Sequence, residues 1–247
     1  MPNITSHLGL AWEALENLPN PILKEHLGSY LLGAASPDIR IITRQPRDAT
    51  HFSFLDSETV DVGVLEMLDR YPKIANKENM SPGTQAFIAG YITHLITDQV
   101  WIIDIYRPFF GNPSVYEDQV LGNVMDRALQ LEMDSHDRPI WGKATPLLDG
   151  VERSIAVEFI DPLALKEWRE WVQGYGEQEF TWERLHFLAR RQYPEGNSRA
   201  QELVQGFLGS LPDGLRTLHE VVSEQRVAQF RWRAKSEFTR MIEEYLK

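Results

Sequence analysis

The spacing of apolar residues is the feature that most constrains how this chain folds. In most segments they recur every three or four positions, as Leu8, Trp12 and Leu15 do near the start. This period places side chains on one face of an α-helix, whereas a half-buried strand would alternate every second residue. The sequence therefore predicts an all-α fold.

The helix starts are marked by a capping side chain followed by proline, a pair that satisfies and preorganises the first helical turn. The pair occurs at Asn20, Ser81 and Asp161. Residues 34–57 follow neither period and are expected to be irregular, while 138–160 is ambiguous and leaves room for a short strand. Helices are expected over 8–15 (capped by Thr5 or Ser6), 20–33, 59–71, 81–105, 114–134, from 161 through 172, from 181 through 188, 198–208 and 213–246.

The length of 247 residues fits a single domain. We expect one all-α domain over 1–247, in which 1–136 forms a half that carries a metal site and 137–247 forms a helical C-terminal extension. The formal net charge is −11. Such a charge repels nucleic-acid phosphates and anionic bilayers, so coating of nucleic acid and polybasic membrane binding are disfavoured, although local basic patches stay open.

The chain has no cysteine, which excludes disulfides, thiolate zinc sites and cysteine nucleophiles. Any metal must therefore bind to His, Asp, Glu or backbone atoms. The N-terminal stretch has no basic segment followed by an apolar core, so no signal peptide is expected. No uninterrupted apolar run reaches about 18 residues, the length of a membrane-spanning helix. We expect no transmembrane segment and a cytoplasmic location.

A candidate metal site lies in the apolar segment AFIAGYITHLITDQVW, where His94 and Asp98 are four residues apart. This separation puts both side chains on one helical face, one turn apart. The spacing alone often arises by chance, but an unpaired charge on so apolar a helix would be costly to bury, and a cation would offset that cost. His7, Asp38 and His51 upstream bring the number of candidate ligands to five.

These motifs also carry a family resemblance. A histidine in the context T-x-H, then LLGAASPDI, then THF, then AFIAGYITHLITD follow one another over roughly the first hundred residues. The series resembles the zinc-dependent phospholipase C family, and more distantly the S1/P1 nucleases. The resemblance implies a helical bundle with up to three zinc ions at the bottom of a cleft. It matches His7, Asp38, His51 and His94 to ligands of that cluster, and Asp98 to the carboxylate that bridges two metals.

The chain departs from the family pattern in two places. In secreted members the mature amino terminus is itself a ligand, and here removal of Met1 would expose the secondary amine of Pro2. The family also places two histidines and a glutamate after the helix motif, spaced as His, His-x-x-x-Glu, and this sequence has no such pattern. Asp104 stands about where the first of them would be, and the loose candidates for the others are Asp118, Asn123, Asp126 and His136. We therefore expect one or two zinc ions.

The resulting hypothesis is a phospholipase C-like hydrolase of phosphoric esters, acting on a small phosphoester or a phospholipid through metal-activated water. Asp38 is the candidate catalytic residue that orients or deprotonates this water, and it could equally be only a ligand. One alternative is a non-catalytic member of the fold with a structural metal. The other is a metal-free helical binding protein.

Overall fold

The computed structural model describes residues 1–77, 80–193 and 196–247, and the all-α prediction is confirmed, since these residues contain helices and no strand. The strand considered within 138–160 is thus wrong, because that region forms short helical turns. The α-helices are α1 (Ile4–Ala14), α2 (Pro21–Glu25), α3 (Leu27–Ala35), α4 (Arg40–Thr43), α5 (Asp48–His51), α6 (Val62–Arg70), α7 (Pro72–Ala75), α8 (Pro82–Trp101), α9 (Gln119–Asp137), α10 (Trp141–Ala144), α11 (Pro162–Glu177), α12 (Arg184–Gln192), α13 (Ser198–Gly209), α14 (Asp213–Val221) and α15 (Glu224–Leu246). The 3₁₀ turns are η1 (Leu15–Asn17), η2 (Ser36–Ile39), η5 (Arg138–Ile140), η6 (Thr145–Leu147) and η7 (Val151–Ser154), and η4 (Ile102–Phe110) is a π-helix.

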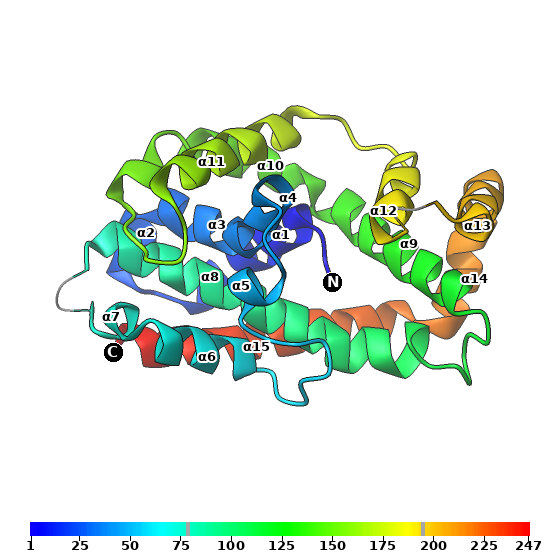
Figure 1. The fold of residues 1–247 in the computed structure, drawn as a ribbon, viewed down its shortest axis with the longest axis horizontal. Coiled ribbons are helices and arrows are strands. Elements are labelled where there is room, and N and C mark those ends of the chain that lie inside the picture. Colours follow the sequence, from blue (N-terminus) through cyan, green and yellow to red (C-terminus); the bar gives the residue numbers. More distant parts are fainter. Residues whose placement is uncertain (78–79, 194–195) are drawn as a thin grey trace.

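Helix α8 is the centre of the molecule, with α3 and α15 packed along it (Figure 1). It starts as the sequence predicts, because the Ser81 hydroxyl accepts a hydrogen bond from the backbone N–H of Thr84 at 3.1 Å and Pro82 takes the first helical position. By length and composition Pro82–Phe110 could cross a membrane, but 94% of its most apolar 18-residue stretch is buried inside the protein. Burial on all sides is typical of a core helix.

Two glycines let α3 and α8 approach closely. A Cβ added at Gly90 would lie 1.8 Å from the carbonyl oxygen of Tyr30, and one added at Gly33 would lie 2.0 Å from that of Phe87. Only glycine fits such backbone contacts. The close approach brings the last turn of α3 against the face of α8 that carries His94.

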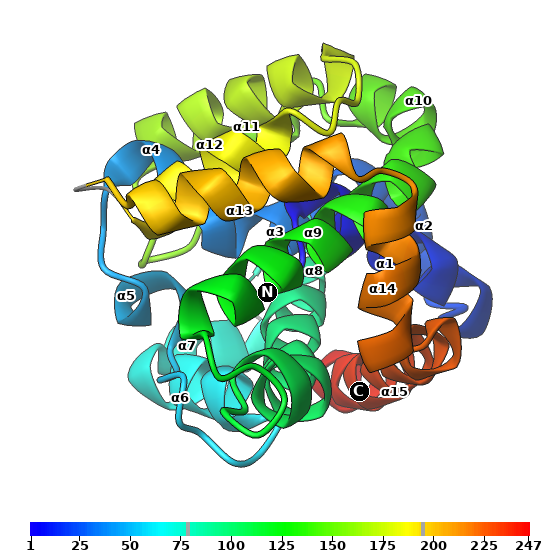
Figure 2. The same cartoon turned by 90° about the vertical axis from the view of Figure 1, so that its right-hand side faces the viewer.

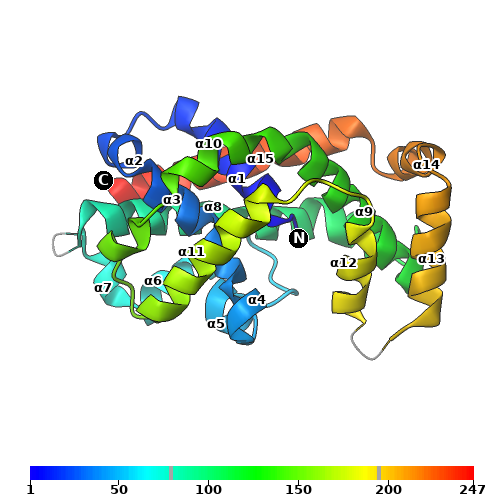
Figure 3. The same cartoon turned by 90° about the horizontal axis from the view of Figure 1, so that it is seen from above.

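The C-terminal helices frame one end of the molecule. Helices α12 and α13 pack on α9 (Figure 2), and α14 leads from α13 to the long α15. Helix α11 runs across the molecule and contacts η2 (Figure 3). Asp161 caps α11 as expected, accepting hydrogen bonds from the N–H groups of Leu163 and Ala164.

Two predicted helices are in fact broken. The helix expected over 20–33 changes direction at His26, whose backbone leaves the helical region, and becomes α2 and α3. The helix expected over 213–246 breaks at Val222, and Ser223 caps the new helix α15. The helices on either side of each break both have regularly spaced apolar residues. The spacing of apolar residues therefore does not reveal such short breaks.

The segment expected to be irregular is also partly helical. Residues 34–57 contain η2, α4 and α5, and α4 and α5 end at Arg44 and Phe52 in the left-handed region, with φ of 60° and 55°. Single helical turns are too short to show a period. Their arrangement places Asp38 in η2 and His51 at the end of α5, both facing α8. The first helix begins at Ile4, so Thr5 and Ser6 lie inside it and do not cap it.

Candidate metal centre

Five of the six sequence-predicted ligands come together. Two sets of potential ligand atoms each lie within 4.8 Å of one another: His7, His94 and Asp98, and Asp38, His51 and His94. They come from α1, η2, α5 and α8. The three histidines and Asp98 are buried, whereas Asp38 is half-buried.

The Asp98 carboxylate lies at the middle of this cluster. Its Oδ1 is 3.3 Å from His7 Nε2, and its Oδ2 is 3.3 Å from His51 Nε2 and 3.8 Å from His94 Nε2. None of these contacts has hydrogen-bond geometry: the three Nε2 atoms and Asp98 Oδ1 are buried without a hydrogen-bond partner among the described residues. Buried polar atoms are rarely left without partners. Nitrogen and oxygen atoms that converge in this way fit a metal ion such as zinc.

The other ring nitrogens of two histidines have partners that orient the ring. His94 Nδ1 lies 2.8 Å from the carbonyl oxygen of Ala34 at the end of α3. A carbonyl only accepts, so the proton sits on Nδ1 and the lone pair of Nε2 faces the cluster. His51 Nδ1 is 2.9 Å from the Thr50 hydroxyl, which itself donates to the Arg47 carbonyl, so His51 has the same tautomer. The sequence did not identify these orienting partners.

Burial sets the protonation states that metal binding requires. Burial lowers the pKa of His94 well below its ordinary value, and the neighbouring His7 lowers it further. Burial also lowers the pKa of His51. Burial alone would raise the pKa of Asp98, but interaction with His94 and with the rings of His51 and His7 brings it well below its usual range. At neutral pH His51 and His94 are thus neutral imidazoles and Asp98 is a carboxylate, the forms that bind zinc.

Asp38 connects the buried cluster with two adjoining cavities, which together form a cleft. Its Oδ1 lies 4.0 Å from His51 Nε2, and its side chain is 20% exposed. It lines a cavity of about 300 Å³ under α11 and α12 as well as a smaller one of about 160 Å³ beside the amino terminus. Since Asp38 and Asp98 both line the smaller cavity, a molecule in the cleft can reach the cluster.

Asp104 lies outside both ligand sets. Six residues past Asp98 correspond to about 1.7 helical turns, so its side chain points to another face. There it forms an ion pair with Arg233 of α15.

The loose downstream candidates are not gathered into a further site among the described residues either. Asp118 caps α9 and pairs with Arg199. Asp126 accepts hydrogen bonds from Trp101 and Gln130. Asn123 bonds with Tyr106 and Tyr193, and His136 is exposed.

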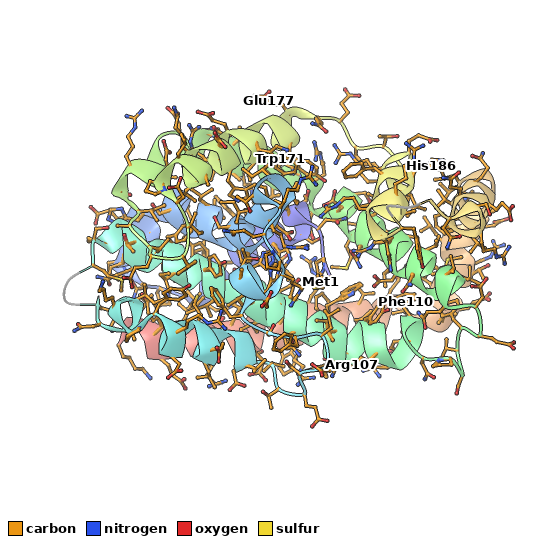
Figure 4. All side chains as sticks on the ribbon, in the orientation of Figure 1. Met1, Arg107, Phe110, Trp171, Glu177 and His186 are labelled. Carbon is orange, nitrogen blue, oxygen red and sulfur yellow. The ribbon has the colours of Figure 1, made fainter. Side chains whose placement is uncertain are left out.

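Arg47 and the amino terminus also lie at the cluster. Arg47 Nη2 is 3.2 Å from Asp98 Oδ2, a contact that the sequence analysis missed although Arg47 precedes His51 by one helical turn. Met1 lies near the centre of the molecule, and Trp171 of α11 is drawn above it (Figure 4). Burial lowers the pKa of the Met1 amino group to about 6, against the opposing charge of Asp126. The small cavity is lined by both Met1 and Pro2.

The family comparison fits this geometry. Residues 6–101 match the family described as zinc dependent phospholipase C. The match confirms the resemblance predicted from the four motifs. It contains all five clustered residues and ends before Asp104. No curated protein and no solved structure matches the chain.

Proposed function

We propose that the protein is a zinc-dependent hydrolase of phosphoric esters, phospholipase C-like in its reaction. The observation that carries the proposal is the buried set of unpartnered ligand atoms around Asp98, which lines the smaller cavity next to one of about 300 Å³ that is large enough for a small ligand. Zinc bound there would supply a water of lowered pKa and a Lewis acid for phosphoryl oxygens.

We propose that the site holds one or two ions. His94 belongs to both groups but has only Nε2 free, because Nδ1 is committed to Ala34. It can therefore serve one ion at a time. Asp98 has Oδ1 toward His7 and Oδ2 toward His51, so this carboxylate would hold a metal together with the histidines of either set.

Asp38 is the residue best placed to act on the attacking water. It is the clustered carboxylate that is half-buried and lines both cavities, so it can meet water and substrate. In this role Asp38 orients a water molecule toward phosphorus and accepts its proton. The buried rings of His51 and His94 hold their tautomers through Thr50 and Ala34 and need no movement during the reaction.

The test is His94→Ala, compared with wild type and with His26→Ala, which lies on the distant turn between α2 and α3. Metal content by elemental analysis and hydrolysis of bis(4-nitrophenyl) phosphate are measured on the purified proteins. We expect His94→Ala to lose its zinc and at least 100-fold in activity, because the substitution removes a metal ligand. His26→Ala should keep its zinc and its activity. Full activity in His94→Ala would refute the proposal. Zinc that raises the melting temperature without any turnover would instead support a structural metal.

A further inference from the structure

Three arginines from separate elements meet at the small cavity beside the cluster. Arg40 follows η2, Arg127 lies on α9 and Arg191 lies on α12, and all three line the cavity together with Asp38 and Asp98. The chain as a whole is strongly acidic, with a net charge of −11. The positive charge at this place is therefore a local feature that the composition does not explain.

These arginines have no carboxylate within ion-pair distance among the described residues. Arg127 is held by neutral amides instead, with the side-chain oxygens of Gln130 at 2.8 Å and Gln192 at 3.4 Å. The Nε of Arg40 is buried and has no hydrogen-bond partner in the described part of the chain. By contrast, Arg231 pairs with Glu13 and Asp137, as is usual for a half-buried guanidinium. Arg40 and Arg127 are likewise half-buried and Arg191 is exposed, so guanidinium donors that no carboxylate binds directly can receive an anion here.

The larger cavity adjoins the small one, and both are lined by Asn3, Asp38, Leu188 and Arg191. In the larger cavity, arginine side chains already lie against the aromatic rings of the wall. The guanidinium of Arg184 lies 4.7 Å from the ring centre of Tyr175, and that of Arg191 lies 6.0 Å from the ring centre of Phe187. A quaternary ammonium group binds on free aromatic faces. Here it would meet two arginines instead.

We infer that this cleft selects a phosphoester that carries a second anionic group, such as a further phosphate, over one with a cationic ammonium headgroup. The inference rests on the proposed function, because it names the substrate class of the same site. The scissile phosphate lies near Asp38, and the second anion binds to Arg40, Arg127 and Arg191 through charge-assisted hydrogen bonds. The apolar part of the substrate occupies the larger cavity, against Ile41, Leu131 and Trp171.

The test compares phosphatidylcholine with phosphatidylinositol 4-phosphate, both with dihexanoylglycerol as the lipid part. The same two headgroups are also tested as phosphodiesters without acyl chains. The zinc-loaded protein should cleave the phosphoinositol ester with a kcat/KM at least tenfold above that of the choline ester. The acyl-free pair shows whether the preference extends to soluble esters. Arg191→Gln should reduce that ratio about fivefold or more. The matched control is Arg190→Gln, which is exposed like Arg191 but lines neither cavity and should leave the ratio unchanged.

Turnover with equal rates for both headgroups, or with a preference for choline, would overturn the inference and leave the proposed hydrolase standing. If no ester is hydrolysed, the proposed function fails, and calorimetric titration with inositol 1,4-bisphosphate and with phosphocholine still tests the cleft. Tighter binding of the bisphosphate by at least tenfold, weakened by Arg191→Gln and kept by Arg190→Gln, would support anion selection. Equal or undetectable binding of the two probes would overturn it.

Discussion

Replacing Gly90 by alanine should both destabilise the protein and disturb the metal centre. The new Cβ would lie 1.8 Å from the Tyr30 carbonyl oxygen and 2.8 Å from the Ala34 nitrogen, whereas real Cβ contacts are essentially never under 3.0 Å. Helices α3 and α8 must therefore separate by about 1.2 Å, and both obstructing atoms belong to backbone that cannot rotate away. The separation loses contact over an extensive buried interface, so we expect a cost of about 3 kcal/mol.

The assay is urea unfolding followed by circular dichroism and tryptophan fluorescence. With a slope of about 3 kcal/mol/M for a chain of this size, the midpoint should fall by about 1 M. Gly206→Ala is the control, because a Cβ there meets nothing within 4 Å in α13 and should stabilise the helix by about 0.5–1 kcal/mol. The same shift of α3 moves the Ala34 carbonyl from His94, so zinc affinity should fall by about 10-fold or more. An unchanged midpoint for Gly90→Ala would refute the reasoning.

Two further predictions concern protonation and capping. Because burial lowers the pKa values of His51 and His94, the unfolded chain binds protons that the metal-free native state does not as the pH falls below about 6.5. Stability is therefore lost as the pH falls from about 7.5 to about 5.5. The Met1 amino group, whose pKa burial lowers to about 6, adds to this loss, whereas His219, whose pKa is raised by Glu132 despite partial burial, opposes it. A urea midpoint that is the same at both pH values, with chelator present, would contradict the lowered pKa values of the buried histidines. Ser81→Ala should cost about 1 kcal/mol by removing the cap of α8. Ser198→Ala, beside the capping Asn197 of α13, should change unfolding by less than about 0.5 kcal/mol, and equal effects of the two substitutions would argue against the cap.

The sequence predicted the parts of the fold that depend on local signals. Helices α8 and α11 begin where a capping side chain precedes a proline, because cap and proline act within one turn. The breaks at His26 and Val222 escaped prediction because apolar spacing continues across them. The turns that carry Asp38 and His51 show no apolar period, because each is about one turn long.

The sequence by itself determined the helical class and named, among six candidate ligands, the five that the structure brings together, because each lies in a short motif whose order along the chain is informative. Only the tertiary structure decided how these residues meet. The glycine contact between α3 and α8 sets the His94 ring against Ala34, and helix geometry turns Asp104 toward Arg233 and out of the cluster. The arginine-lined cleft was likewise beyond sequence reasoning: Arg40, Arg127 and Arg191 are far apart along the chain, and only packing of their helices brings their charges to one cavity.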